Sequence, residues 1–435
     1  MSARRQSAPA DRRARLHDLV AYAVERSPYY RETIGAAGTG ERLDLELLPT
    51  LPKATLMREF DRIVTRPELR LSDLEAHLGG PDAGLPYLGG YRVFASSGSS
   101  GLRGVFVQSE EEFARWVAVH RPVLGRLGIC PSTRLAAIGA PSPIHLSKQL
   151  FAALGSGGAR PLRLSVLTPM PELCAALGAF QPDALLGYSS IVAALAEQQL
   201  MGGLDIAPRV VATGAEILTS ELEQRIADAW AIRPGRIYAT TEAPIIAASD
   251  PGHSALRVLD DVVWIEVVDE HGRHVPPGTP GHRVLVTNLV NRVQPLIRYE
   301  LTDSVTVTGS GEIASIDGRS DDILLLPATG GGGTKPVHPL RLRAPFAHLA
   351  EVVLYQLVQE GEELRVRVVP RSDAAPDLAA RVHRALAAAL AEAGVQPVMR
   401  IELVDSIERD GHAAKLKLIT RGEPQPAILM RSFRA

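Results

Sequence analysis

The chain has 435 residues, of which 46% are hydrophobic and 22% are charged. This length exceeds what one hydrophobic core usually supports, so it indicates a globular protein of two or three domains. The 47 basic and 49 acidic side chains give a net charge of −2, which excludes a bulk electrostatic attraction to nucleic acid or to an anionic membrane.

Two cysteines, Cys130 and Cys174, are too few for a disulfide framework or a structural zinc site. No apolar run reaches the ~18 residues that a membrane span needs. The start of the sequence lacks the apolar core of a secretory signal. We therefore expect a cytoplasmic protein without a membrane segment.

The first part of the chain alternates between helical and strand-like patterns. Apolar residues recur at helical spacing over 14–38, with a break at Pro28, and again over 110–129. Short apolar strands then alternate with helices up to residue 230. Strands are expected in 134–141 and 159–167, with a helix over 147–158 between them. Each of the next two stretches, 184–203 and 209–230, is expected to begin with a strand and to continue as a helix. This order predicts a layered α/β domain with a largely parallel sheet.

From about residue 256 the apolar residues alternate in period two around turns rich in glycine and proline, which predicts antiparallel strands. The boundary is expected in 316–336, giving a large domain over 1–317 and a small α+β lid domain over 318–435. The small domain should contain a hairpin that turns at Gly361, a helix over about 376–393 and a last strand over 398–405.

The stretch "FASSGSSGLRGVF", residues 94–106, lies between two strand-like segments. Its small residues suit either a flexible linker or a loop whose backbone N–H groups and hydroxyls bind phosphate. It is no Walker loop, because Leu102 and Arg103 follow Gly101 where that motif has Lys-Ser/Thr.

Five stretches in a fixed order decide between these two readings: "SSGSSG" at 96–101, "TGAE" at 213–216, "YATTEAP" at 238–244, "PLIRYELTD" at 295–303 and "GRSDD" at 318–322. In this order they resemble the adenylate-forming enzymes, in particular the branch of phenylacetate–coenzyme A ligase. The N-terminal stretch "LPTLPKATLMREFD" also resembles that branch, so the similarity extends over nearly the whole chain.

The resemblance implies that ATP and Mg²⁺ activate an aryl or arylacetic acid to an acyl adenylate, which then passes to the thiol of coenzyme A. Two alternatives stay open. The acyl group could pass to a carrier-protein thiol or an amine in a biosynthetic pathway, or the chain could be a non-catalytic nucleotide-binding homologue. The resemblance also implies a homodimer.

By the same resemblance, one group of residues would fold over the β- and γ-phosphates of ATP: Ser97, Gly98, Ser99, Ser100 and Gly101. Relatives commonly have a lysine near the end of this loop, and here Arg103 is the only cation nearby in the sequence.

The stretch 238–242 would bind the nucleotide and the metal. Tyr238 would stack near adenine, with Ala239 and Thr240 beside it. Thr241 would contact the α-phosphate, and Glu242 would hold Mg²⁺, which prefers oxygen ligands. The alternative for Glu242 is a carboxylate that caps a helix.

Two further regions would complete the pocket for nucleotide and acyl group. Gly214, Ala215 and Glu216 would line it, with Gly214 leaving room for a ligand. His145 would stand beside the acyl group as a gating residue, or would be a buried structural imidazole.

The remaining implied residues lie toward the C-terminus. Asp303 would accept both ribose hydroxyls, or would be a turn aspartate. Arg319 would add a ribose or phosphate contact, and Asp321 would be the hinge about which the small domain rotates. Lys415 would neutralise charge during adenylation; Lys417 is the second choice, and a solvated basic strand is the alternative.

The sequence departs from the family in two places. Relatives usually have Arg-Thr-Gly-Asp where this chain has Glu300, Leu301, Thr302 and Asp303. A run of four glycines, 330–333, stands where relatives have a shorter turn before a helix, which here would begin at His338 or Pro339. We interpret the run as a mobile loop that either contacts the acceptor or is passive.

Overall fold

The computed structural model describes residues 9–35, 43–96, 103–154, 161–319, 322–337, 339–349, 351–372, 374–408 and 416–422. The chain divides into two compact units at Asp317 and Gly318, and each is described separately. Within the described residues, no helix combines the length and apolar character that crossing a bilayer requires.

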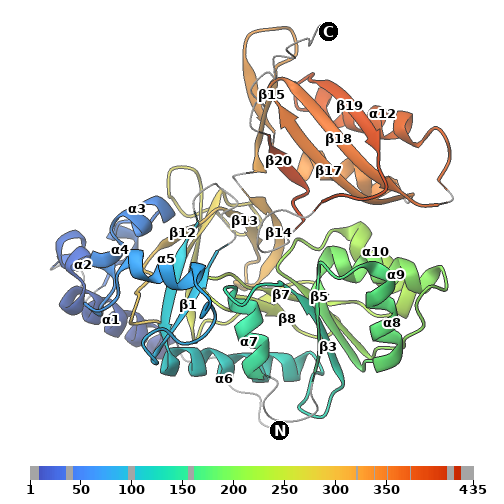
Figure 1. Ribbon diagram of the computed structural model, residues 1–435. Helices are drawn as coiled ribbons and strands as arrows, with labels where there is room; N and C mark the ends of the chain where they lie inside the picture. The colour runs from blue at the N-terminus through green and yellow to red at the C-terminus, as the bar shows by residue number, and fades with distance from the viewer. Residues whose placement is uncertain are drawn as a thin grey trace, which may run out of the picture. The chain divides into compact units, whose positions relative to one another are not determined.

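The first unit begins with helices that pack around one apolar core (Figure 1). The expected break at Pro28 is confirmed, because α1 ends at Arg26 and α2 starts at Pro28, with the Ser27 hydroxyl accepting a hydrogen bond from the N–H of Tyr30. The helical segments here are α1 (Pro9–Arg26), α2 (Pro28–Thr33), η2 (Leu45–Leu47), α3 (Lys53–Arg58), α4 (Phe60–Ile63) and α5 (Leu71–Gly79).

A nine-stranded sheet forms the centre of this unit, in the order β13-β14-β9-β8-β7-β6-β5-β3-β4. The strands from β4 to β7 run parallel, as the alternation of strands and helices predicts, and β8 and β9 are antiparallel. The strands are β3 (Leu135–Gly139), β4 (Leu162–Ser165), β5 (Ala184–Tyr188), β6 (Val210–Gly214), β7 (Gly235–Tyr238), β8 (Ala247–Ser249), β9 (Leu256–Val258), β13 (Asp303–Val307) and β14 (Ile313–Arg319).

Helices cover both faces of the parallel strands. Apolar side chains of α8 (Met170–Phe180), α9 (Ser189–Leu200) and α10 (Ser220–Trp230) pack on one face. The C-terminal part of α6 (Glu110–Arg126) and α7 (Leu146–Leu154) pack on the other. Figure 1 shows α8, α9 and α10 together beside β3 and β5. The α/β class is therefore confirmed.

Two smaller sheets complete the first unit. The hairpin of β1 (Tyr91–Ala95) and β2 (Val105–Ser109) flanks the glycine- and serine-rich stretch. The antiparallel strands expected after residue 256 are confirmed in the sheet of β10 (Val263–Val268), β11 (Arg283–Asn288) and β12 (Tyr299–Leu301).

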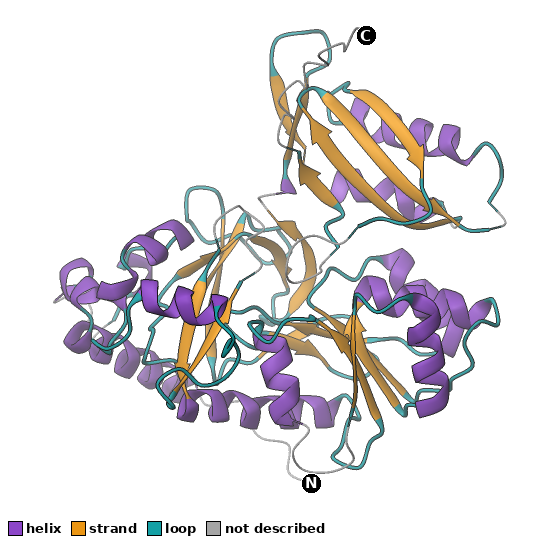
Figure 2. Ribbon diagram, viewed as in Figure 1, coloured by secondary structure: helices purple, strands orange, loops and turns teal. Residues whose placement is uncertain are grey.

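The second unit is a four-stranded sheet with a helix on one face (Figure 2). Alternate residues of β18 are buried against α12, and the expected hairpin turns at Gly361, whose φ is +62°. Its elements are β15 (Leu324–Pro327), β16 (Thr334–Val337), α11 (Pro339–Arg343), η4 (Ala344–His348), β17 (Val352–Glu360), β18 (Glu363–Pro370), α12 (Leu378–Glu392), β19 (Val398–Leu403) and β20 (Ile419–Arg421).

The four-glycine run is the exposed turn of the β15–β16 hairpin. All four glycines, 330–333, have positive φ, a conformation that other residues adopt only with strain. The helix expected near this turn begins at Pro339, while His338 lies outside the described residues.

A buried ion pair joins Arg298, the residue before β12, to Glu266 on β10 of the same sheet. The Arg298 guanidinium contacts both carboxylate oxygens of Glu266, at 2.9 and 3.1 Å, and both side chains are almost fully buried. Arg298 also donates to the carbonyl oxygens of Glu46 and Leu48, and its φ of +49° lies in the left-handed region. The surrounding contacts therefore fix a strained backbone in place.

Arg298→Met is expected to destabilise the protein by about 3–5 kcal/mol, because it leaves the Glu266 carboxylate buried without its partner. Chemical denaturation of the full chain measures this loss. The control is Arg115→Met, which removes an exposed pair with Glu111 and should cost less than about 1 kcal/mol. Equal effects of the two variants would contradict the importance of the buried pair.

Candidate active site

The carboxyl ends of the parallel strands meet at one edge of the central sheet, which is where α/β sheets of this kind bind ligands. Gly214 ends β6 and Tyr238 ends β7, and these two strands are direct neighbours. The ends of these strands and the loops that follow them carry six of the residues predicted for nucleotide binding: Gly214, Ala215, Glu216, Tyr238, Ala239 and Thr240.

Tyr238 and Asp303 are in contact although 65 positions separate them. The Tyr238 hydroxyl donates to Asp303 Oδ2 over 2.9 Å, and Tyr238 is only 6% exposed. Asp303 is the first residue of β13 and does not lie in a turn. The bond fixes the Asp303 carboxylate next to the ring that is predicted to contact adenine.

Glu242 is buried, with 7% of its surface exposed, and its carboxylate is oriented by a second tyrosine. The Tyr299 hydroxyl donates to Glu242 Oε1 over 3.1 Å, and the Asn288 side chain donates to the Glu242 carbonyl oxygen over 2.8 Å. Among the described residues no helix begins next to Glu242, because α10 ends at Trp230 and the next helix starts at Pro339, so the helix-cap alternative is wrong. Within the described residues, Oε2 of this carboxylate takes no hydrogen bond.

The turn that carries Glu242 is closed by Thr240. Its N–H donates to the Ala243 carbonyl oxygen over 3.1 Å, and its hydroxyl accepts from the Ala243 N–H over 3.0 Å. Ala239 and Thr241 are half-buried beside it. The turn is thus held at its base and presents Thr241 and Glu242.

His120 of α6 contacts the same turn through the Pro244 carbonyl oxygen. Its ring nitrogens lie 2.8 Å from the Trp116 carbonyl oxygen and 3.2 Å from that of Pro244. Burial lowers the pKa of His120 to about 4, so the ring is neutral at pH 7. His120 is therefore a fixed support rather than an acid or base at neutral pH.

The residues after β6 are constrained in a different way. A side chain on Gly214 would bring its Cβ within 3.0 Å of the Ile237 carbonyl oxygen, and Ala215 has a φ of +65°. Glu216 Oε2 accepts from the N–H and the hydroxyl of Ser190, at 3.0 and 2.6 Å, at the start of α9. The Glu216 carboxylate thus fixes a neighbouring helix, which sequence reasoning did not anticipate.

The structure places only some of the other predicted residues. His145 is buried in the connection from β3 to α7, and Arg319 is the last residue of β14. Lys417 lies before β20 in the second unit. Three predictions fall outside the described residues: the loop Ser97–Gly101, the hinge Asp321 and Lys415.

Sequence reasoning missed the role of the segment that leads into α3. The Leu51 N–H donates to the Arg298 carbonyl oxygen, and the Leu51 carbonyl oxygen accepts from the Glu300 N–H, at 2.9 and 3.1 Å. The Thr50 hydroxyl donates to Glu300 Oε1 over 2.6 Å. The stretch "LPTLPKATLMREFD" was the available signal, but it names no partner.

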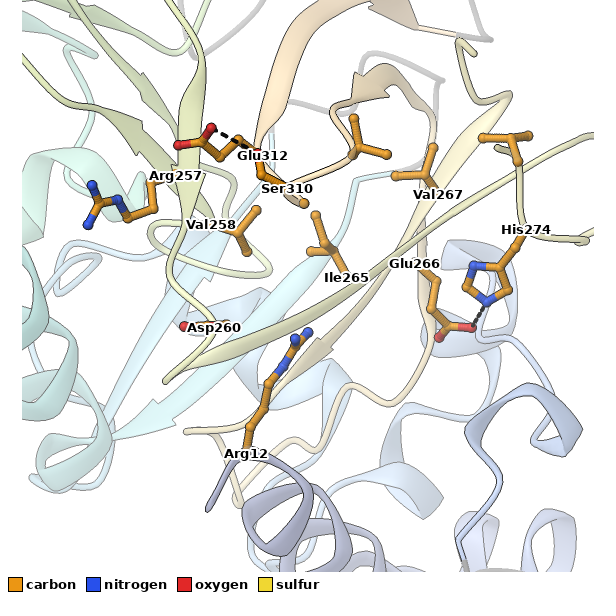
Figure 3. A pocket seen from close by; sticks show the side chains of 13 residues that line it. Arg12, Arg257, Val258, Asp260, Ile265, Glu266, Val267, His274, Ser310 and Glu312 are labelled. Atoms are coloured by element: carbon orange, nitrogen blue, oxygen red, sulfur yellow. Dashed lines mark hydrogen bonds and ion pairs between the residues drawn. The ribbon is translucent and has the colours of Figure 1, made fainter. Parts of the chain in front are cut away.

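The first unit also has a surface hollow of about 300 Å³ that contains none of these residues (Figure 3). Arg12 enters it from α1 with its guanidinium over the Trp264 ring at 3.9 Å, and His274 lies 3.5 Å from Glu266. Side chains of both signs line it, so it lacks a uniform charge for an anionic nucleotide.

Comparison with known proteins agrees with this geometry. No family model matches the chain. It is 27% identical over 388 residues to phenylacetate-coenzyme A ligase of Thermus thermophilus, covering 81% of this chain and 80% of that protein. The crystal structure of 2-hydroxyisobutyryl-CoA ligase in the postadenylation state has a TM-score of 0.72 at 19% identity, covering 95% of this chain and 90% of that one. The chain is thus similar in sequence to phenylacetate–coenzyme A ligase and shares the fold of 2-hydroxyisobutyryl-CoA ligase, which supports the resemblance to the adenylate-forming enzymes.

Two more proteins are similar to this chain, one in sequence and one in fold. Protein CapK of Staphylococcus aureus is 22% identical over 335 residues, covering 71% of this chain and 67% of that protein. ATP-bound MatB from Rhodopseudomonas palustris has a TM-score of 0.54 at 18% identity, covering 75% of this chain and 65% of that one.

The chemistry of the described residues is compatible with the magnesium ion that the sequence resemblance implies. They contain no group of three histidine, cysteine or acidic side chains that could enclose a metal. Mg²⁺ usually needs only one or two carboxylates in nucleotide sites, because phosphate oxygens and water supply its other ligands. Glu242 offers one oriented carboxylate with a free oxygen, which is sufficient.

Proposed function

We propose that this chain activates a carboxylic acid with ATP to an acyl adenylate and then transfers the acyl group to the thiol of coenzyme A, releasing AMP. One observation carries the proposal. Two hydrogen bonds, Tyr238 to Asp303 and Tyr299 to Glu242, join the segments 238–242 and 299–303. They bring an aromatic ring and two carboxylates of different function to one edge of the sheet.

In the first half-reaction an oxygen of the acid forms a bond to the α-phosphorus, and the bond from that phosphorus to the bridging oxygen of pyrophosphate breaks. The protein contributes mainly position and charge compensation. Asp303 accepts the ribose hydroxyls, Tyr238 packs on adenine, and Thr241 contacts the α-phosphate. Gly214 lies beside them, and a Cβ there would be 3.0 Å from the Ile237 carbonyl oxygen, so a larger residue would crowd the neighbouring strand β7.

Glu242 would hold a magnesium ion, whose positive charge would offset the negative charge of the phosphates. The Tyr299 hydroxyl and the Asn288 amide keep the carboxylate of Glu242 and its backbone in place. His145 borders the acyl group, and Ala239, Thr240, Ala215 and Glu216 complete the walls of the pocket.

In the second half-reaction the thiol attacks the acyl carbonyl and AMP leaves. We assign ATP and acid binding to residues 1–317 and the mobile lid to 318–435, with Asp321 as hinge, Arg319 as a further nucleotide contact and Lys415 as the lid lysine. An aryl or arylacetic acid, a cytoplasmic location and a homodimer complete the proposal. A carrier-protein thiol or an amine remains the alternative acceptor.

Pyrophosphate release from ATP with a panel of aliphatic, aryl and arylacetic acids tests this proposal. We expect release with at least one class, and consumption of coenzyme A in step with it. Release that continues only with hydroxylamine or a carrier protein would favour the alternative acceptor. No pyrophosphate release with any of the acids, together with retained ATP binding, would favour a non-catalytic homologue.

Asp303→Ala is expected to weaken ATP binding by about ten- to a hundredfold, because two ribose hydroxyls lose a charged acceptor. Isothermal titration of ATP into the full chain measures the change. Tyr238→Phe is the matched variant, since it removes only the hydroxyl that orients Asp303 and should have a smaller effect. Unchanged ATP affinity in Asp303→Ala would show that the carboxylate does not hold the ribose.

A further inference from the structure

The surface hollow of the first unit lies apart from the candidate active site, although both involve β13. Asp303 begins β13, whereas Val307 at the other end of this strand borders the hollow. The volume of about 300 Å³ falls at the lower end of the range in which proteins bind small molecules. None of the residues that line it is assigned to the nucleotide pocket, so a ligand held here would be a second molecule.

Arg12 brings a positive charge into the hollow without a bonded partner. Its guanidinium lies over the Trp264 ring at 3.9 Å, and its Nε atom is buried. Among the described residues it forms no hydrogen bond or ion pair. Stacking on Trp264 fixes the plane of the guanidinium and leaves its N–H donors pointing outward within that plane. A carboxylate can accept two such donors side by side, so Arg12 offers a preformed position for one.

Asp260 brings a negative charge into the same hollow (Figure 3). Burial lowers the pKa of Arg12, and the charge of Asp260 acts in the opposite direction, which shows that the two side chains are near enough to interact electrostatically. Even so, the half-buried Asp260 carboxylate takes part in no hydrogen bond or ion pair with the described part of the chain. It can therefore accept from a cationic group.

The other charged side chains that line the hollow already have partners. These contacts are Glu266 with Arg298, Arg257 with Asp250, His274 with Glu46, and Glu312 with the hydroxyl of Ser310. Arg12 and Asp260 are thus the two charges of the lining that a bound molecule would complete.

Branched aliphatic side chains form another part of the lining. They come from β9, β10, β13 and the connection after β10: Val258, Ile265, Val267, Val275 and Val307. Branching at Cβ makes such side chains stiff, so they provide a fixed apolar surface. Covering this surface with an aliphatic group of a ligand removes apolar area from water and favours binding.

We propose that this hollow binds a free aliphatic α-amino acid as its zwitterion. The carboxylate accepts from the Arg12 guanidinium, the ammonium donates to Asp260, and the aliphatic side chain packs on the branched residues. A molecule with only one of the two charges leaves the other half-buried charge without a partner, which costs free energy. Because the hollow shares no residue with the nucleotide pocket, this binding is independent of the proposed function.

Titration calorimetry on the full-length chain tests the proposal with three matched probes. They are L-leucine, 4-methylpentanoate, which lacks the amino group, and 3-methylbutylamine, which lacks the carboxylate. We expect L-leucine to bind about tenfold more tightly than either of the others, the effect of one additional hydrogen bond between charged groups. Absence of heat from L-leucine and from L-valine at about 10 mM would overturn the proposal.

Two variants show whether the binding occurs in the hollow. Arg12→Met should lower the affinity for L-leucine about tenfold and leave that for 3-methylbutylamine unchanged, because only the carboxylate loses its partner. Asp260→Asn should have the converse effect, with 4-methylpentanoate unaffected. Asp260→Asn keeps the size of the side chain, so it decides the test if Arg12→Met does not fold.

The control is Arg115→Met, which removes an exposed cation of α6 and should change none of the affinities. Leucine binding that stays at the wild-type level in both Arg12→Met and Asp260→Asn would place the amino acid elsewhere on the chain, for instance in the pocket for the acid. That result would overturn the proposal and leave the proposed function standing.

Discussion

Replacing Glu242 by glutamine should slow adenylation by about two to three orders of magnitude, the loss expected when a preorganised charge in an active site is removed. The amide keeps the size of the side chain and can still accept the Tyr299 hydrogen bond, so the fold should persist. A neutral amide is a much weaker ligand for Mg²⁺ than a carboxylate. Pyrophosphate release at saturating ATP, measured over a range of Mg²⁺ concentrations, reports both the lower rate and the higher Mg²⁺ requirement.

Two further variants distinguish a loss of metal binding by Glu242 from a general effect on the structure. Tyr299→Phe removes the hydroxyl that orients Glu242 and should cost about tenfold. Glu111→Gln neutralises an exposed carboxylate of α6 and should leave the rate and the Mg²⁺ requirement unchanged. An unchanged Mg²⁺ dependence in Glu242→Gln would remove Glu242 from the metal site.

Lys415→Ala is expected to reduce adenylation by about two to three orders of magnitude while thioester formation from a preformed adenylate remains largely intact. The reason is that the ammonium compensates charge on the α-phosphate and the acid only while pyrophosphate departs. The measurement compares pyrophosphate release from ATP with consumption of coenzyme A in the presence of synthetic acyl adenylate.

Lys417→Ala is the matched variant for this prediction, since it removes a lysine only two positions away. A large loss of adenylation in Lys417→Ala with wild-type behaviour of Lys415→Ala would exchange the two assignments. Equal loss of both half-reactions in Lys415→Ala would show that the lysine supports structure or coenzyme A binding instead.

The sequence predicted the fold where local signals were strong. Pro28 ends a helix because proline cannot continue it, and Gly361 turns a hairpin because glycine tolerates positive φ. Helix α8 was not anticipated: its preceding residue Pro169 makes no side-chain cap, and its buried residues pack on strands distant in sequence. Short helices such as α3 depend on tertiary contacts for the same reason.

For the candidate site, the sequence predicted the residue types but not their contacts. Residue types and their order indicated a nucleotide pocket, but the sequence could not pair Tyr238 with Asp303 or Lys53 with Ser96. Such bonds join segments whose proximity only the folded sheet creates. For Glu216 the motif suggested a residue of the pocket, but its carboxylate accepts hydrogen bonds from Ser190 at the start of α9.

Glu300, which stands where relatives usually have arginine, links two segments of the first unit. Its carboxylate binds the Thr50 hydroxyl on one side and Arg283 Nη1, at 3.1 Å, on the other. An arginine at position 300 would face Arg283 and lose the acceptor for Thr50. The side chains at positions 50, 283 and 300 are therefore energetically coupled, and introducing the common family arginine at position 300 alone would leave Thr50 and Arg283 without their acceptor.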